Sequence, residues 1–197
     1  MVLVQAQTPP REGGHRVTAL DMAASGINMK SIEEVHTFKE YCETLTFMAS
    51  LASTEKVILV GHSLGGMNLA LAMENFPEKI SVAVFLAVFL PDTIHQPSHV
   101  LEKVTRCEKF REMAPDGTWQ DTRFSTYGSL ENPGTSILLG DEFTSHLYSA
   151  SSVKDLELAK MLKRPSSRLV HDLSREREVH GQGLRICEET MLDRERR

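Results

Sequence analysis

The chain has few cysteines, few aromatic residues, no long apolar run and no excess of positive charge. Its 197 residues include three cysteines and one tryptophan, and the formal net charge is −5. The cysteines, Cys42, Cys107 and Cys187, are odd in number and lack metal-ligand spacing, which argues against a disulfide framework and a zinc site. The negative charge gives no electrostatic case for nucleic-acid binding. We therefore expect no metal, no cofactor and no nucleic-acid partner.

The apolar runs are too short for a membrane anchor. The longest, residues 82–90, falls far below the roughly 20 residues that span a bilayer. Residues 1–14 have neither the basic start nor the apolar stretch of a secretory signal. We therefore expect a cytoplasmic protein without a membrane partner. The length suits one domain with an elaboration. The sequence does not set the oligomeric state, and a homodimer is one state that it allows.

The first half of the chain alternates between predicted strands and predicted helices. Its strand-like stretches are residues 15–21, 56–60 and 82–90. From Ser31 to Met48 apolar residues recur every three or four positions, which predicts a helix that begins in a capping box of Ser31 and Glu34. Helical spacing returns at Met67 and stops at Pro77. This alternation is typical of a parallel α/β sheet.

The second half of the chain has a different pattern. Residues 91–165 carry most of the prolines, the tryptophan and a helix-like stretch at 153–162, but no comparable strand run, so we expect an insertion over the sheet. Beyond it, half of residues 174–197 are Arg, Asp or Glu, which predicts a solvated and poorly ordered tail. The predicted division is a core at 1–90, a cap at 91–165 and the tail from residue 166 to the end.

Residues 61–65, Gly-His-Ser-Leu-Gly, match the G-x-S-x-G nucleophile elbow. In that motif a serine sits on a tight turn between a strand and a helix, and its hydroxyl projects above the sheet edge. Such five-residue patterns also occur by chance, but here a predicted strand comes directly before and a predicted helix directly after. We predict Ser63 as the nucleophile. The backbone N–H of Leu64 is the expected oxyanion donor, because it follows the serine at the start of a helix.

The neighbours of the predicted nucleophile have structural roles in this interpretation. Gly61 and Gly65 are expected where adjacent groups come too close for a Cβ atom, and Gly66 is expected to let the following helix pack tightly. His62 is next to the serine on a sharp turn, so its side chain points elsewhere. We expect its imidazole to form a hydrogen bond behind the elbow instead of acting as the base.

Several longer stretches carry a resemblance to a known family. They are VILVGHSLGGMNLALAMENFPEKI, HRVTALDMAASGI, AVFLAVFLPD, TWQDTRFSTYGS and LVHDLS. Over residues 13–174 the chain resembles the plant methylesterase and hydroxynitrile lyase group, which includes the salicylic-acid-binding methylesterases. The resemblance implies an α/β-hydrolase fold with a mostly parallel sheet and an inserted cap. It also implies hydrolysis of methyl esters of small plant signalling acids such as salicylate, jasmonate and indole acetate.

The resemblance also implies roles for single residues. It makes Ser63 the nucleophile and Leu64 an oxyanion donor, and it places Trp119 in the wall of the acyl pocket. The lyases of the group usually have cysteine where this chain has Leu64, which favours the esterase branch. A lone tryptophan is, however, more often a packing anchor than a ligand contact. The same alternative holds for other apolar cap residues, namely Met113, Phe124 and Tyr127.

The acid and the histidine of a Ser-Asp-His triad are not found in the expected motifs. Asp172 and His180 follow the cap in the right order but lack flanking strands, so we do not assign them. Residues 5–10 contain no H-G-A loop for a second oxyanion donor. We hypothesise a chain truncated at both ends, without the C-terminal core strands. The alternatives to an active esterase are a non-catalytic binder of a small acid such as salicylate, or an inactive remnant.

Overall fold

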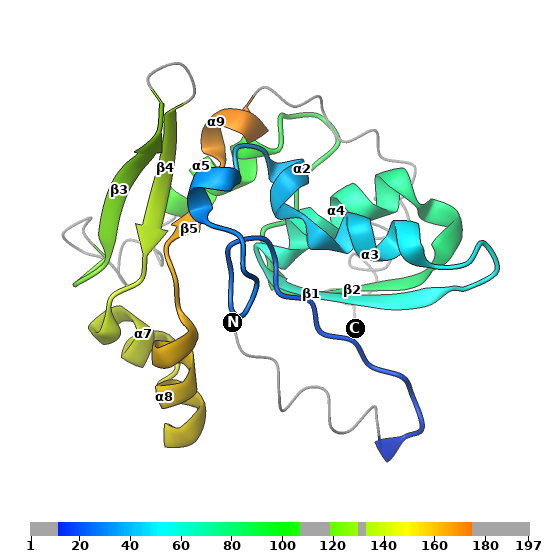
Figure 1. Cartoon of the computed structure of the whole chain (residues 1–197), viewed down its shortest axis with the longest axis horizontal. Coiled ribbons are helices and arrows are strands. Elements are labelled where there is room, and N and C mark those ends of the chain that lie inside the picture. The colour runs from blue at the N-terminus through cyan, green and yellow to red at the C-terminus, as the bar shows by residue number, and fades with distance from the viewer. Residues whose placement is uncertain (1–11, 107–118, 130–132, 175–197) are drawn as a thin grey trace, which may run out of the picture. The chain divides into compact units, whose positions relative to one another are not determined.

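The computed structural model describes residues 12–106, 119–129 and 133–174 (Figure 1). Two compact units make up the chain. One comprises residues 37–107 and 170–197, and the other comprises residues 1–36 and 108–169.

In its described residues, the unit built on residues 37–107 has a pair of parallel strands that helices cover on one face (Figure 1). Its regular elements are α2 (Phe38–Tyr41), α3 (Glu43–Ser50), β1 (Val57–Ser63), α4 (Gly65–Asn75), the 3₁₀ turn η2 (Pro77–Lys79), β2 (Ile80–Val88), α5 (Ser98–Arg106) and α9 (Val170–Leu173). Helix α4 contacts both strands, and α3 packs on α4. The apolar residues buried between them are Met48, Leu51, Leu59, Leu69 and Ala72. Two predicted strands and the helix between them are therefore confirmed.

The periodic stretch that begins at Ser31 is not one helix. It divides into η1 (Ile32–Glu34), α2 and α3. The capping box of Ser31 and Glu34 is present, but a second capping box follows, in which Thr37 accepts from the Glu40 N–H and Glu40 accepts from the Thr37 N–H. A capping box satisfies the free N–H groups of a new helix start. The apolar residues therefore keep their spacing of three or four positions although the chain divides here into separate short helices.

The described residues of the other unit form a small antiparallel sheet and several short helices. Its elements besides η1 are β3 (Arg123–Gly128), β4 (Pro133–Leu138), α7 (Asp141–Leu147), α8 (Val153–Leu162) and β5 (Ser166–Ser167). The strand order is β3-β4-β5. Helix α8 has the predicted bounds, and the described part of residues 91–165 contains no strand run comparable to β1 or β2, although it does form the short antiparallel strands β3 and β4, which the sequence did not predict. Strand β3 is largely exposed and β4 is mostly half-buried, with Ser136 buried, and neither has the continuous apolar run of a buried parallel strand.

The strand predicted at residues 15–21 is also absent. Residues 15–21 have no regular secondary structure. A turn follows it, in which the Ser25 N–H donates to the Met22 carbonyl at 3.0 Å. Gly26 has a φ of +53°, and a Cβ there would lie 2.3 Å from Oδ1 of Asp21. The local alternation of apolar residues was therefore insufficient to predict a strand here.

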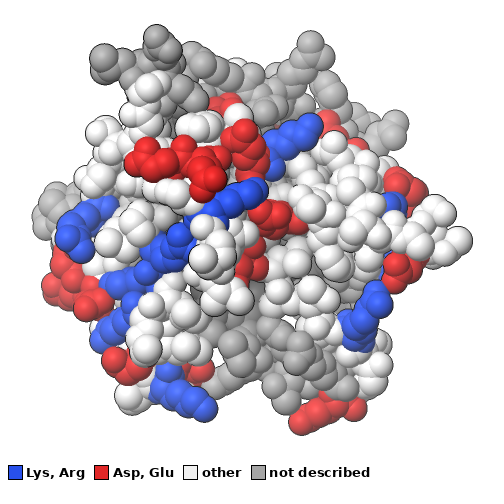
Figure 2. Space-filling view, in the orientation of Figure 1, with Lys and Arg blue, Asp and Glu red and all other residues white. Residues whose placement is uncertain are grey.

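Further along, residues 166–174 of the predicted tail form β5 and α9, and residues 175–197 lie outside the described residues. Lys and Arg side chains are interspersed with Asp and Glu on the face shown in Figure 2. None of the helices in the described parts of the chain has the length and hydrophobicity that crossing a membrane requires.

Candidate active site

Ser63 lies at the junction of β1 and α4 in a rare backbone conformation. Its φ is +55°, in the left-handed region that residues other than glycine seldom adopt. Leu64 has helical angles, with φ −60° and ψ −18°, and precedes the first residue of α4. The Ser63 carbonyl accepts a hydrogen bond from the Phe89 N–H at 3.0 Å, which ties the turn to the end of β2. This combination of strand, strained serine and helix is the geometry of a nucleophile elbow.

Two of the three neighbouring glycines stand where a side chain would not fit. A Cβ on Gly61 would lie 2.8 Å from the Gly65 carbonyl oxygen, and one on Gly66 would lie 2.5 Å from the Cβ of Val88. Both expectations are therefore confirmed. The expectation for Gly65 is wrong, because no described atom lies within 4 Å of the Cβ that it lacks. Steric crowding by neighbouring atoms thus requires glycine at positions 61 and 66, but not at position 65.

The first turn of α4 is held by the carbonyl of Leu64. That oxygen accepts from the Met67 N–H at 3.1 Å and from Nδ2 of the buried Asn68 at 3.2 Å. The first N–H groups of a helix have no partner four residues earlier, and the helix dipole makes this end attractive to an anion. The backbone at Leu64 therefore lies at the helix end that attracts negative charge.

His62 occupies the turn without the expected hydrogen bond. Its Nδ1 atom is buried and has no partner among the described residues. Burial lowers the pKa of the imidazole below its ordinary value, so the ring is neutral at pH 7. The prediction of a hydrogen bond behind the elbow is thus wrong for Nδ1, because no described polar group lies within reach of that atom.

Asp172 has a structural partner in the same unit. Its Oδ2 accepts a hydrogen bond from the Phe38 N–H at 2.6 Å, and Phe38 is the first residue of α2. The carboxylate therefore serves the end of a helix. His180, the other candidate for the triad, lies outside the described residues.

Trp119 packs in an aromatic cluster of the other unit. Its ring stacks on that of the buried Phe143 with centroids 5.4 Å apart, and it meets the ring of Phe124 edge-on at 5.9 Å. These contacts support the packing role weighed for this residue. The hydroxyl of Tyr127 donates to the Val35 carbonyl at 2.9 Å, which gives it a structural role as well. Met113 lies outside the described residues.

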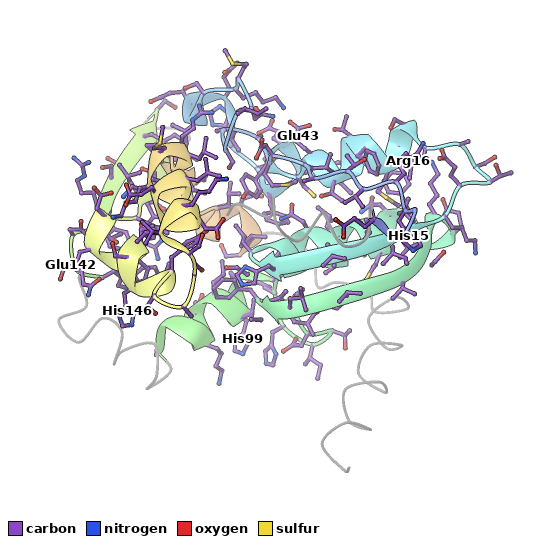
Figure 3. All side chains as sticks on the ribbon, turned by 90° about the horizontal axis from the view of Figure 1, so that it is seen from below. His15, Arg16, Glu43, His99, Glu142 and His146 are labelled. Atoms are coloured by element: carbon purple, nitrogen blue, oxygen red, sulfur yellow. The ribbon has the colours of Figure 1, made fainter. Side chains whose placement is uncertain are left out.

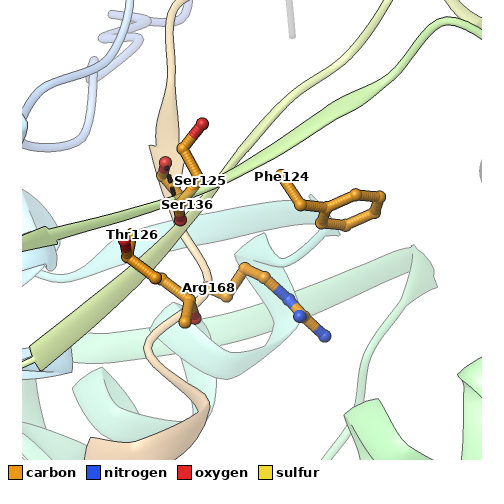
Figure 4. Close-up of a pocket in the computed structure, with 6 residues that line it drawn as sticks. Phe124, Ser125, Thr126, Ser136 and Arg168 are labelled. Atoms are coloured by element: carbon orange, nitrogen blue, oxygen red, sulfur yellow. Dashed lines mark hydrogen bonds between the residues drawn. The ribbon is translucent and has the colours of Figure 1, made fainter.

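An open groove of about 520 Å³ lies beside Phe124 (Figure 4). Its other lining residues are polar: Ser125, Thr126, Thr135, Ser136 and Arg168. The guanidinium of Arg168 lies 5.5 Å from the centroid of the Phe124 ring. Small-molecule sites are usually concave and mostly apolar, so this hydroxyl-lined groove differs from the acyl pocket expected for a methyl ester.

The chain around this serine is similar to known proteins. The alpha/beta hydrolase fold family matches residues 4–180. Salicylic acid-binding protein 2 from Nicotiana tabacum is 52% identical over 164 residues, which cover 82% of this chain and 61% of that protein. Methylesterase 1 from Arabidopsis thaliana is 50% identical over 173 residues, which cover 86% of this chain and 63% of that protein.

A solved structure gives the same result. The crystal structure of polyneuridine aldehyde esterase matches with a TM-score of 0.77 and 46% identity, over 86% of this chain and 65% of that one. The α/β-hydrolase fold and the resemblance to methylesterases are thereby confirmed. The chain spans about three fifths of the length of the curated relatives it matches.

Proposed function

Because the chain belongs to the alpha/beta hydrolase fold family, we propose that it is a carboxylic ester hydrolase of the methylesterase type. Ser63 is the proposed nucleophile. The observation that carries this proposal is the left-handed backbone of Ser63 between β1 and α4. The proposed substrate class is supported by the relatives, two of which are named for methylesterase activity and for salicylic acid binding.

In the proposed reaction the Ser63 hydroxyl oxygen attacks the ester carbonyl carbon. The negative charge that forms on the carbonyl oxygen is stabilised by the Leu64 N–H at the start of α4. Methanol then leaves with a proton, and water releases the acid from the acyl-enzyme. The attack needs a base to take the serine proton. Asp172 is already bound to the Phe38 N–H, which argues against it as the partner of that base.

The proposal also covers the substrate, the cellular location, the oligomeric state and the domain boundaries. The proposed esters are methyl salicylate, methyl jasmonate and methyl indole acetate, with Trp119 against the acyl group. A cytoplasmic location, a homodimer and the division into core, cap and tail at residues 90 and 165 stay predictions. Separate assays with the three methyl esters, each followed by chromatography of the released acid, would rank them.

The nucleophile can be tested by comparing two serine variants. Wild-type protein should hydrolyse p-nitrophenyl acetate and react with a fluorophosphonate probe. Ser63→Ala should lose both activities, whereas Ser81→Ala, which changes an exposed serine on β2, should retain them. Equal rates for the wild type and Ser63→Ala would rule out the proposed role of Ser63.

A second candidate function is the binding of a small aromatic acid without turnover. This alternative is motivated by the triad acid and histidine that the sequence does not supply in the expected motifs, and by a relative named for salicylic acid binding. Calorimetric titration with salicylate distinguishes the two functions. Binding without ester turnover would support the second candidate, and turnover that depends on Ser63 would support the first.

A further inference from the structure

Three side chains with metal-binding atoms converge just after β2. They are Asp92, His95 and His99, and one ligand atom from each can be chosen so that all three lie within 4.8 Å of one another. Asp92 and His95 belong to the loop that follows the strand, and His99 lies on α5 (Figure 3). All three belong to one compact unit, and none is part of the proposed esterase chemistry.

The loop holds Asp92 and His95 in place. Oδ1 of Asp92 accepts hydrogen bonds from the N–H groups of Ile94 and His95, at 2.9 Å and 2.7 Å. Its other oxygen, Oδ2, lies 2.7 Å from Nδ1 of His95. One carboxylate oxygen is thus fixed by the backbone, and the second faces the imidazole.

His99 brings a second imidazole to the same place. The rings of His95 and His99 stack with centroids 4.0 Å apart and an angle of 11° between their planes. The hydrogen bond between Asp92 and His95 could by itself serve only to hold the loop in place. His99 has no part in that hydrogen bond, yet its ring brings a nitrogen as a third donor atom close to the other two groups.

We propose that Asp92, His95 and His99 form a binding site for a divalent transition-metal ion of the Zn²⁺ type. Two imidazole nitrogens and one carboxylate oxygen form a ligand set that zinc accepts, and the remaining position is open to water. The proposed ligands are Oδ2 of Asp92, Nδ1 of His95 and a ring nitrogen of His99. The proton shared by Asp92 and His95 must leave Nδ1 when the ion binds.

Binding such an ion requires the two stacked imidazole rings to rotate, because each ring nitrogen binds a metal in the plane of its own ring and the two planes are nearly parallel. Ligand atoms at zinc distances of about 2.1 Å in a tetrahedron lie about 3.4 Å from one another. The ligand atoms here span up to 4.8 Å, so the side chains must close by rotation. The side chains of His95 and Asp92 are 49% and 41% exposed, which leaves room for that rotation and a path for the ion.

The test is a zinc titration of chelator-treated protein by isothermal calorimetry. All measurements use a protein that carries both Cys107→Ser and Cys187→Ser, called the background protein, because these thiols would compete for the ion. We expect one site, and we expect each of Asp92→Asn, His95→Ala and His99→Ala to weaken binding about tenfold or more. The matched control is His146→Ala, which changes an exposed histidine on α7 (Figure 3) and should leave the affinity unchanged.

Cobalt spectra give a second readout that does not depend on the calorimetry. Co²⁺ bound by nitrogen and oxygen ligands should give a visible absorption band in the background protein and in His146→Ala, and the band should be lost in His99→Ala. Circular dichroism of each variant verifies that it is folded. Absence of zinc binding, or binding that survives substitution of all three residues, would overturn the proposal. Loss of binding in His146→Ala alone would also overturn it.

Discussion

The carboxylate of Asp172 accepts a hydrogen bond from the backbone N–H of Phe38, 134 residues earlier in the chain, at 2.6 Å. Phe38 is the first residue of α2, and its N–H has no partner within the helix. A negative charge at this end also interacts favourably with the helix dipole. A side chain that follows the cap in the sequence therefore completes the start of a helix in the first quarter of the chain.

This contact predicts a stability effect for Asp172. Asp172→Ala should lower the free energy of unfolding by about 1.5–3 kcal/mol, the usual range for a hydrogen bond to a charged group. Asp172→Asn keeps an acceptor but not the charge, so it should lose less. Urea denaturation followed by circular dichroism measures both variants. If Asp172→Ala abolished esterase activity while the unfolding midpoint stayed unchanged, the helix-capping role would be contradicted.

The glycines around the elbow predict opposite effects for two neighbouring substitutions. Gly66→Ala should destabilise the protein by about 1–3 kcal/mol, because its Cβ would lie 2.5 Å from the Cβ of Val88. Gly65→Ala is the matched control. It meets no described atom within 4 Å and should be neutral or stabilise the helix start by about 0.4–1 kcal/mol. Thermal unfolding of both variants provides the comparison, and equal losses would contradict the packing argument.

The parts of the fold that the sequence predicted are those with strong local signals. Strands β1 and β2 are continuous apolar runs, and α4 and α8 have clear helical periods. The hairpin of β3 and β4 was missed because its strands are short and have no continuous apolar run, and residues 15–21 form no regular strand. Pairing between distant segments is a tertiary property that a local pattern does not contain.

The candidate sites follow the same rule. The elbow geometry at Ser63 was predictable because the elbow is a contiguous motif with a strand before it and a helix after it. The contact of Asp172 with Phe38 was not, because it joins distant segments. The spacing of Asp92, His95 and His99 is visible in the sequence, whereas cysteine spacing alone gives no sign of a metal site. Acids and histidines spaced by three and four residues would have been the useful signal.

Cys42 gives a prediction for alkaline pH. Burial raises the pKa of its thiol from 9.0 to about 11, so the folded protein keeps the thiol neutral where the unfolded chain forms a thiolate. The stabilising effect is complete below pH 9.0 and is lost as the pH rises towards 11. Cys42→Ala should therefore flatten the alkaline decline in stability. Iodoacetamide should label the Cys42 peptide only after urea is added, and rapid labelling of the folded protein would contradict this account.

The final prediction concerns the face of the parallel pair that α4 leaves uncovered. Ile58, Val60, Val82 and Leu86 are between 49% and 60% exposed, whereas Leu59 on the opposite face is buried. Ile58 pairs with Val82 across the two strands, so the exposed side chains form a continuous apolar patch. Contiguous patches of this kind favour association between molecules.

A charge in this patch should reduce self-association without unfolding the protein. Val82→Lys should raise the monomer fraction in analytical ultracentrifugation and lower the binding of a hydrophobic dye. Leu59→Lys is the matched control, because it places the same charge in the buried core, where an unpaired charge is costly. That variant should unfold. If Val82→Lys left both the association and the dye binding unchanged, this patch could not be the surface through which the molecules associate.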